Sequence, residues 1–410
     1  MNDELRSMAV AIFSAGVAAA DPVQAVDTAL RVTPLGQCNG KVFIVGIGKA
    51  AIGMALAARS HVSSTGRCII VTNYENAIEV DDATVFAAGH PVPDNNGLVA
   101  SKAVMKLLQN AGPDDHVLAL ISGGGSALLP APVEGVSLED KAEVNRLLLG
   151  SGVEISEMNL VRQQLSLLKG GGFLRFTAPA KVTALILSDV IGDDLRAIAS
   201  GPTVSPIGSA ADARAVLVRA GIMDAIPVSV KTHLEKASRP APIDPCVVDN
   251  RLIGSNAISC QAMAVAAGDA TLIPEPLVGD VEQAARNVIA AARSGITLFG
   301  GETTVVLRGR GMGGRNQELA LRVALLAQSA GWADDWVFLS GGSDGRDGPT
   351  DAAGGLVDGS TLSRMRENGV DPLISLAEND SYHALQAAGD LLIIGATGTN
   401  VADLQVLIRA

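Results

Sequence analysis

The stretch VFIVGIGKAAIGMALAA, residues 42–58, decides the fold class of this protein. Its apolar first half predicts a buried strand, its second half has helical spacing, and glycines stand at the turn between them. Gly46, Gly48 and Ala51 match the G-x-G-x-x-G/A pattern of a dinucleotide-binding strand–turn–helix unit. Lys49, however, stands in the first turn of the predicted helix, where phosphates would lie. The stretch therefore leaves open a dehydrogenase's cofactor loop and part of a kinase.

The composition favours a layered α/β protein of two domains. The chain has 410 residues, of which 48% are hydrophobic, only 3% are aromatic and 45 are glycine. Small apolar residues in short runs suit stacked helices and strands better than a β-sandwich or a coiled coil. The formal net charge of −12 disfavours nucleic acid and anionic membranes as partners. Local basic residues must then bind any anionic substrate.

The N-terminus and the cysteines predict a cytoplasmic, reduced protein. The first residues, MNDELRSMAVAIFSAGVAAADP, carry acidic charges and helical apolar spacing, which indicates an amphipathic helix rather than a signal peptide. No apolar run approaches the ~18 residues of a membrane span. Cys38, Cys68, Cys246 and Cys260 form no C-x-x-C pair, so we expect reduced thiols that are mostly buried.

Short apolar runs alternate with helical patterns along the whole chain, which predicts parallel sheets with helices on both faces. The predicted strands are 42–46, 68–72, 84–88, 116–121, 182–188, 247–253, 296–299, 304–308, 336–340 and 391–394. The predicted helices are 49–62, 97–111, 137–149, 154–168, 211–220, 255–267, 281–294, 313–329 and 401–408.

The stretch KASRPAPIDPCV, residues 236–247, is the best candidate for a linker because it holds three prolines between a predicted helix and a predicted strand. We therefore predict an N-terminal domain over residues 1–240 and a C-terminal domain over residues 241–410.

Four predicted strands end in glycine-rich polar stretches, and in open α/β sheets ligands bind at the carboxyl ends of strands. One of these stretches is ISGGGSALLPAP, residues 121–132. Its three glycines allow backbone amides to turn toward an anion, and the flanking hydroxyls can add hydrogen bonds. The candidate phosphate-binding residues are therefore Ser122, Gly123, Gly124, Gly125 and Ser126. The alternative is a flexible turn, and the stretch is not a Walker A loop.

The stretch LILSDVIGDDLRAIASGPT, residues 185–203, places acidic residues at the end of another predicted strand. Asp189 and Asp193 are candidate ligands for Mg²⁺, which takes one or two carboxylates together with substrate phosphates. For Asp193 and Asp194, capping of a helix N-terminus is an equally good interpretation.

The stretch LFGGETTVVLRGRGMGGRNQELALRVALLA, residues 298–327, contains Glu302 at a tight turn and Arg315 at the start of a predicted helix. An arginine there opposes the helix dipole, which favours acidic residues at that end. We interpret Arg315 as a ligand for a carboxylate or a phosphate. The alternative is an ion pair with Glu318 or Glu302 on the surface.

Two further stretches carry candidate polar groups. The loop-like LSGGSDGRDGPTDAAGGLVD, residues 339–358, holds Asp344, Asp347 and Asp351 after a predicted strand, and a long glycine-rich loop there is more often functional than idle. Asp347 in it could equally be a surface residue. His90, in AAGHPVPDNNG, is either an acid–base group or a hydrogen-bonding turn residue.

Taken together, these stretches resemble the D-glycerate 2-kinase family, whose C-terminal part is the MOFRL domain. The resemblance covers nearly the whole chain in eight ordered runs: VGIGKAAIGMA, GHPVPDNNG, SGGGSALLPAP, MNLVRQQLSLLKGG, SDVIGDDLRAIASGPT, GGETTVVLRGRGMGGRNQELAL, SDGRDGPTDAAGG and GATGTNVADL. The chain departs from the family at Gln163 and Gln164, where basic residues are usual, and at Ile191 and Leu195, where prolines are usual. These departures bear on substrate detail rather than on class.

The resemblance implies phosphorylation of glycerate on its 2-hydroxyl, dependent on ATP and Mg²⁺, in a site between a Rossmann-like N-terminal domain and an α/β C-terminal domain. Lys49 and Arg315 match the critical lysine and arginine of the family. Asp189 and Asp193 would then position Mg²⁺, and either Glu302 or Asp344 would accept the hydroxyl proton, a choice that the sequence leaves open. The expected partner is a small molecule, and a homodimer is compatible with the sequence.

Two other functions stay open at this point. A hydroxypyruvate reductase would use the fingerprint glycines, with Glu75 as the ligand of a dinucleotide ribose. A non-catalytic sugar-phosphate-binding module would explain the glycines but not the clustered acidic residues.

Overall fold

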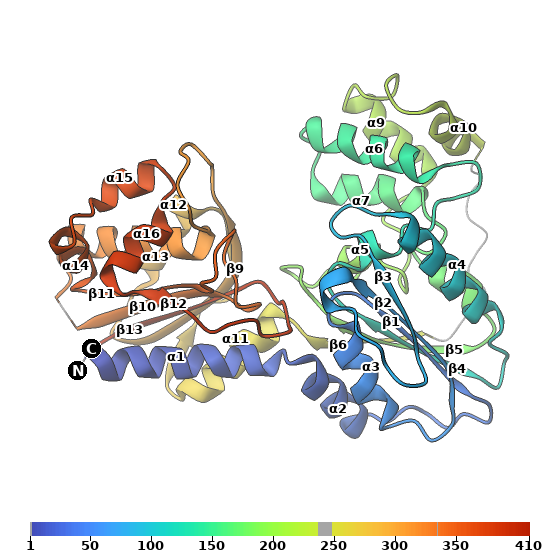
Figure 1. Ribbon diagram of the computed structural model, residues 1–410, viewed down its shortest axis with the longest axis horizontal. Coiled ribbons are helices and arrows are strands. Elements are labelled where there is room, and N and C mark those ends of the chain that lie inside the picture. The colour runs from blue at the N-terminus through green and yellow to red at the C-terminus, as the bar shows by residue number, and fades with distance from the viewer. Residues whose placement is uncertain (1, 237–247, 334) are drawn as a thin grey trace. The chain divides into compact units, whose positions relative to one another are not determined.

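The computed structural model describes residues 2–236, 248–333 and 335–410, which form two compact units (Figure 1). The N-terminal unit comprises Pro22–Ser188 and Asp193–Ile253. The C-terminal unit comprises Gly254–Ala410, the short segment Asp189–Gly192 and the first helix of the chain. The predicted boundary at residue 240 and most of the predicted linker, including Cys246, lie outside the described residues.

The N-terminal unit is built on a six-stranded sheet in the order β3-β2-β1-β4-β5-β6. The strands are β1 (Val42–Ile47), β2 (Thr65–Asn73), β3 (Thr84–Ala88), β4 (His116–Ile121), β5 (Lys181–Leu187) and β6 (Val248–Gly254). β1 to β5 pair in parallel, and every residue of β1 and β4 is buried, as their continuous apolar runs require. The order of the strands reverses between β1 and β4. At such a point a Rossmann fold binds its ligand, at the carboxyl ends of the strands.

Helices of the N-terminal unit fall into two groups. Those that accompany the sheet are α2 (Pro22–Val32), α3 (Ala51–Arg59), α4 (Asn95–Gln109), the short α5 (Gly125–Leu128) and α8 (Gly172–Thr177), with 3₁₀ turns η1 (Tyr74–Asn76) and η2 (Ile198–Ser200). The others are α6 (Leu138–Gly150), α7 (Ile155–Gln164), α9 (Ala210–Arg219) and α10 (Val228–Lys236). Figure 1 shows the helices of this second group. They share a separate apolar core, in which Leu148, Val161, Leu217 and Val230 are almost wholly buried.

The C-terminal unit contains a seven-stranded mixed sheet in the order β12-β11-β10-β13-β9-β7, with β8 also pairing with β9. The strands are β7 (Ala270–Leu272), β8 (Leu277–Asp280), β9 (Gly295–Thr304), β10 (Trp336–Gly342), β11 (Gly354–Asp358), β12 (Leu391–Leu392) and β13 (Asp403–Arg409). β13 lies antiparallel between β9 and β10. Its amino end therefore meets their carboxyl ends at one edge of the sheet.

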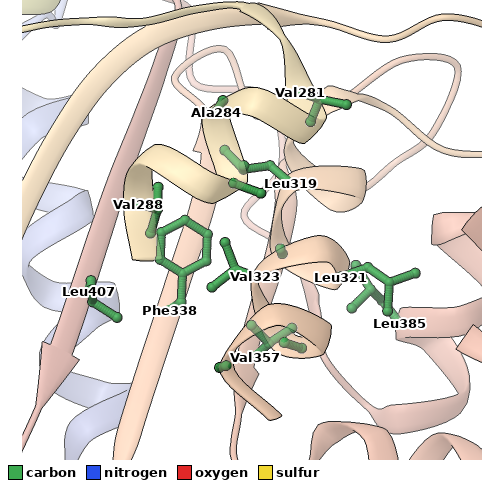
Figure 2. Close-up of a cluster of buried hydrophobic side chains, with 14 of the residues drawn as sticks. Val281, Ala284, Val288, Leu319, Leu321, Val323, Phe338, Val357, Leu385 and Leu407 are labelled. Carbon is green, nitrogen blue, oxygen red and sulfur yellow. The ribbon is translucent and has the colours of Figure 1, made fainter. Parts of the chain in front are cut away.

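Both faces of this sheet are covered, because alternate residues of a strand point to opposite sides. On one face, α12 (Val281–Ala291), α13 (Arg315–Ser329), α14 (Thr361–Glu367) and α16 (Ser381–Ala388) pack on the sheet, while α15 (Pro372–Ala377) lies beside α16. Figure 2 shows Val288 of α12 and Val323 of α13 on either side of the Phe338 ring of β10. The neighbouring Val337 and Leu339 face the opposite layer.

That opposite layer consists of α1 (Asn2–Ala19) and α11 (Asn256–Ala267), which lie side by side. The Phe13 side chain of α1 is fully buried among residues of β10 and β13. Arg6 of α1 also forms ion pairs with Asp358 (2.6 Å) and Asp390 (2.9 Å). The chain therefore begins in the C-terminal unit, whereas the predicted ranges assigned its first helix to the N-terminal domain.

The predicted fold class, a two-domain α/β protein with a Rossmann-like N-terminal sheet, is confirmed, but the prediction of a helix over 401–408 is wrong. That segment is β13. Its residues are buried on both faces, and a short continuous apolar run does not distinguish a buried strand from a buried helix. The prediction of a separate strand at 304–308 is also wrong, because one strand, β9, runs through to Thr304 and ends there.

Cys68 and Cys260 are buried, as predicted, and burial raises the pKa of their thiols to about 11 and about 12. Among the described helices, no single one is long and apolar enough to cross a membrane, and only the bent pair of α1 and α2 has the required length and composition.

Candidate active site

In the N-terminal unit, the loop after β1 is held by the loop after β4. The Lys49 amide donates to Gly123 O at 2.9 Å, and the Ala50 amide donates to the Ser122 hydroxyl at 3.1 Å. The Ser122 amide in turn donates to Ile47 O at 2.8 Å. These are the amides that would bind the pyrophosphate of a dinucleotide, and here they bind protein. The Ser122 hydroxyl, predicted to bind phosphate, is buried and holds this loop instead.

Two glycines allow the close approach of these loops. Gly48 has φ +124°, and a Cβ atom on it would lie 2.2 Å from Ser122 Oγ. Gly48 therefore makes room for Ser122 rather than for a ligand. Gly124 has φ +85°, and a Cβ atom on it would lie 3.1 Å from His90 Cδ2 and 3.3 Å from Lys49 Cγ. The Gly124 backbone thus lies against both Lys49 and His90.

The Lys49 side chain is exposed, and among the described residues its ammonium has no hydrogen-bond or ion-pair partner. Burial and, secondarily, the charge of Lys49 lower the pKa of His90, so the imidazole is neutral at pH 7. Glu75, the predicted ribose ligand of the reductase interpretation, follows β2 and accepts a hydrogen bond from Asn73 Nδ2 at 2.5 Å. The edge of the sheet at β1 and β4 therefore presents an unneutralised cation.

Ser126 lies in a second group at the same edge. Its hydroxyl lies 2.8 Å from the Ser200 hydroxyl and accepts a hydrogen bond from Lys169 Nζ at 2.9 Å. The sequence analysis quoted the runs that contain Lys169 and Ser200 but did not single either residue out. The available signal was the run of three glycines after Lys169, which indicates a tight turn presenting its side chain.

In the C-terminal unit, Arg315 begins α13 and is held by acidic residues from two strands. Its Nε lies 2.6 Å from Asp403 Oδ2, its Nη2 lies 2.9 Å from Asp403 Oδ1, and its Nη1 lies 3.2 Å from Glu302 Oε1. Asp403 is paired in the sheet with Gly301 of β9 and Gly342 of β10, so it sits between the ends of those two strands. The sequence analysis missed Asp403, although the run GATGTNVADL contains it.

The acidic residues around Arg315 shift the pKa of Glu302. Burial raises the pKa of Glu302; Arg315 lowers it, and the charges of Asp403, Asp189 and Asp344 raise it further. Asp344 follows β10, and its Oδ1 accepts the Arg346 amide at 3.0 Å. The structure thus brings together four predicted residues, Arg315, Glu302, Asp344 and Asp189, at one edge of the C-terminal sheet.

Asp347 has a structural role in the same loop. It is buried, and its carboxylate accepts the amides of Asn316 at 3.1 Å and Gln317 at 2.8 Å at the start of α13. These bonds satisfy amides that the first turn of α13 leaves unpaired, although burial raises the pKa of Asp347 to about 7. Asp347 is therefore a helix cap rather than a surface residue.

The two predicted Mg²⁺ ligands fall in different units, Asp189 in the C-terminal and Asp193 in the N-terminal unit. Asp193 Oδ1 is buried and accepts no hydrogen bond from the residues that the structure describes, whereas Asp194 pairs with Arg196 at 2.8 Å. No cluster of three or more metal-ligating side chains occurs within the described ranges. Mg²⁺ held largely by substrate phosphates requires only one or two carboxylates, so the orphaned oxygen of Asp193 fits such a role.

The fold and these two groups define a two-unit α/β protein whose strand ends carry an exposed lysine in one unit and an arginine among clustered carboxylates in the other. Two family models match the chain: "Domain of unknown function (DUF4147)" over residues 8–235 and "MOFRL family" over residues 295–403. The chain belongs to the glycerate 2-kinase family, as its resemblance implied.

Its relatives match it over nearly their whole length. A D-glycerate 2-kinase of Thermotoga maritima is 39% identical over 98% of this chain and 98% of its own. An Agrobacterium vitis protein called "Putative hydroxypyruvate reductase" is 42% identical over 97% of this chain and 93% of its own. A crystal structure of glycerate kinase from Thermotoga maritima has a TM-score of 0.92 at 38% identity and covers 100% of both chains.

Proposed function

We propose that this protein is a glycerate 2-kinase that transfers the γ-phosphoryl group of ATP to the 2-hydroxyl of D-glycerate. One observation carries the choice of reaction. The Lys49 and Ala50 amides after β1 are bonded to the loop after β4, while the Lys49 side chain extends from the same turn without a partner among the described residues. A turn of this kind supplies a positive charge for phosphoryl transfer and lacks the open amides that a dinucleotide requires.

Phosphoryl transfer depends on positioning and charge neutralisation more than on covalent chemistry. Lys49 stabilises the charge on the transferring phosphoryl group. The loop of Gly123, Gly124, Gly125 and Ser126 binds phosphate, and Ser122 holds that loop in place. Arg315 binds the carboxylate of glycerate or the γ-phosphate through Nη1, which faces Glu302, since Asp403 occupies its other edge.

Glu302 is the better candidate for the general base that accepts the hydroxyl proton. Burial raises its pKa, and a general base works best when its pKa approaches the operating pH. Asp344 is less suited because one of its carboxylate oxygens already accepts the Arg346 amide. Glu302→Gln should abolish the acidic limb of the pH–rate profile, whereas Asp344→Asn should leave that limb in place.

Asp189 and Asp193 would hold Mg²⁺ together with phosphate oxygens. The bound ion would supply neutralisation of the charge on the phosphates. Removal of divalent cations by a chelator should abolish turnover, and added Mg²⁺ should restore it. Asp193→Asn should raise the Mg²⁺ concentration needed for half-maximal rate.

The name of the Agrobacterium vitis relative favours a hydroxypyruvate reductase, whereas the geometry of the loop after β1 argues against one. Gly48 of the fingerprint serves protein packing, because it makes room for Ser122. The names of glycerate kinases from bacteria, archaea and animals, among them the human enzyme at 36% identity, favour the kinase.

A paired assay tests the proposal. Purified protein is incubated with D-glycerate and MgATP and, separately, with hydroxypyruvate and NADH or NADPH. Release of ADP that depends on glycerate supports the kinase, and oxidation of the reduced nicotinamide alone contradicts it. Identification of the product by NMR distinguishes 2-phosphoglycerate from the 3-phosphate.

Variants at Lys49 and Arg315 test the residue roles. Lys49→Ala should lower turnover by about 100-fold or more, the scale for loss of one group that stabilises transition-state charge. Lys181→Ala is the matched control, because Lys181 is also exposed but lies at the amino end of β5. Arg315→Ala should reduce turnover on the same scale. Near-normal kinase rates in both Lys49→Ala and Arg315→Ala would contradict the assignment.

A further inference from the structure

Lys169 is a buried cation whose charge no carboxylate neutralises. Its side chain is 8% exposed, and its ammonium donates one hydrogen bond, to Ser126 Oγ at 2.9 Å. An ammonium group has three donors, so two remain available. Within the described ranges, no aspartate or glutamate forms an ion pair with Lys169. A buried cation in this state is costly unless an anion joins it.

Two neighbouring basic residues, Arg162 and Lys141, also form no ion pair with a carboxylate in the described part of the chain. Arg162 donates to the side-chain oxygens of Asn145 at 2.8 Å and Asn159 at 3.5 Å, and the Lys141 ammonium donates to Pro130 O at 2.5 Å. All these acceptors are neutral. Burial and, secondarily, the charge of Arg162 lower the pKa of Lys169 to about 7, and Lys169 in turn helps to lower the pKa of Lys141. The cluster is therefore short of negative charge.

The segment that carries Ser200 is held in an unfavourable backbone conformation. Ala199 and Ser200 have φ values of +49° and +61°, a region that residues with a Cβ atom rarely adopt. The Gly170 amide donates to Ser200 O at 3.0 Å, and Gln163 Nε2 donates to the same oxygen at 3.1 Å. The first bond comes from the turn that bears Lys169 and the second from α7, so both hold the Ser200 backbone beside Lys169.

The cluster is contiguous with the loop after β4. Ser126 is partly exposed, and its hydroxyl contacts both Ser200 and Lys169. An anion bound at the glycine-rich loop would therefore reach the hydroxyl pair and the ammonium behind it.

We propose that Lys169, with the hydroxyls of Ser126 and Ser200, forms an anion-binding site for a phosphate group of the nucleotide, and that Lys169 takes up a proton when this phosphate binds. Phosphate fits better than a carboxylate because it has more oxygens to accept hydrogen bonds from the ammonium and the two hydroxyls, and more negative charge to favour protonated Lys169. The identity of the ligand as a nucleotide rests on the proposed function, whereas binding of phosphate and uptake of a proton do not require turnover.

Calorimetric titration of the intact protein with ADP tests the site. The titration is run at pH 8 in HEPES and in Tris, which have different ionisation enthalpies. Wild-type protein should take up about 0.5 to 1 proton per ADP, because a group with a pKa near 7 is mostly deprotonated at pH 8 and the bound anion favours its charged form. Lys169→Met should weaken ADP binding at least tenfold and abolish the proton uptake.

Three comparisons make the test decisive. Lys49→Met should retain the proton uptake, since Lys49 is exposed and lies outside this cluster. Ser200→Ala removes one hydroxyl and keeps every charge; it should weaken ADP binding severalfold and retain most of the uptake, and it serves if Lys169→Met does not fold. Inorganic tripolyphosphate should bind with the same proton uptake as ADP.

Other outcomes overturn the proposal. Wild-type ADP affinity and proton uptake in folded Lys169→Met would exclude Lys169 from the phosphate site. If ADP affinity is unchanged but the KM for glycerate rises, the anion is the glycerate carboxylate instead. Protein that binds ADP with proton uptake yet lacks kinase activity would retain this site and contradict the proposed function alone.

Discussion

Arg315 and Asp403 form a bidentate ion pair in the C-terminal unit, with Nε 2.6 Å from Oδ2 and Nη2 2.9 Å from Oδ1. Asp403 is almost wholly buried between the ends of β9 and β10, so both of its carboxylate oxygens serve the guanidinium. The pairing fixes the plane of the guanidinium and leaves the Nη1 side toward Glu302. These ion pairs hold Arg315 in one orientation, unlike a mobile surface arginine.

Asp403→Asn should lower both the stability of the protein and its turnover. Removing one partner of a buried pair leaves an uncompensated charge, so the free energy of unfolding should fall by about 3 kcal/mol. Urea unfolding measures this change. Turnover should also fall more than tenfold, because Arg315 loses its orientation. Glu143→Gln, which removes an exposed ion pair with Arg146, is the control and should change stability by less than about 1 kcal/mol. Equal effects of the two variants would contradict a buried, orienting role for Asp403.

Gly48→Ala should be more damaging than alanine at another glycine of similar conformation. Gly48 has φ +124° and a Cβ atom there would lie 2.2 Å from Ser122 Oγ, whereas Gly135 has φ +80° with open space around it. Gly135→Ala should cost about 1 kcal/mol of backbone strain. Gly48→Ala adds a steric clash with the loop after β4 and should cost at least about 2 kcal/mol more. Thermal unfolding of both variants provides the comparison, and a cost no larger at Gly48 would be inconsistent with the loop contact.

Asp358 should make stability depend on acid pH. Burial raises the pKa of this carboxyl, but hydrogen bonds from Ser360 and Arg364 outweigh it and bring the pKa from 3.8 to about 2. The carboxylate therefore contributes stability above about pH 4, and this contribution is lost as the pH falls toward 2. Asp358→Asn should be less stable than the wild type by about 1 to 2 kcal/mol at pH 6, and the difference should fall by roughly half at pH 3.

Urea unfolding across this pH range measures the difference between the two proteins. Asp82→Asn is the control, since the Asp82 side chain is 89% exposed. Its difference from the wild type should stay small throughout. A difference between Asp358→Asn and the wild type that grows as the pH falls would have the wrong sign for this explanation.

Phe13→Ala should destabilise the C-terminal unit although Phe13 lies near the start of the chain. Its ring is fully buried against the sheet of that unit, so its removal should cost about 3 to 5 kcal/mol. Met8→Ala on the same helix is the control, because Met8 is 45% exposed. Hydrogen exchange should locate the loss of protection in β10 and β13 after Phe13→Ala. Loss confined to the N-terminal unit would contradict the packing of α1.

Local patterns in the sequence were sufficient to predict the strands and helices of the N-terminal unit. Parallel strands buried on both faces appear as continuous apolar runs between helical patterns. Local patterns also located Lys49, Arg315, Glu302 and Asp344 at strand and helix ends, since ligand-binding residues follow strands in α/β sheets. The family followed from eight ordered runs, which no single run could have established.

Only the tertiary structure decided what each of these residues contacts. Residues 401–408 have an apolar pattern that fits a helix or a buried strand, and pairing with β9 and β10 makes them β13. The partner of Arg315 lies 88 residues away along the chain, and Lys169 and Ser126 are 43 residues apart. Such contacts arise from sheet order and helix packing, which depend on the whole fold, so periodicity within a short window of sequence carries no information about them.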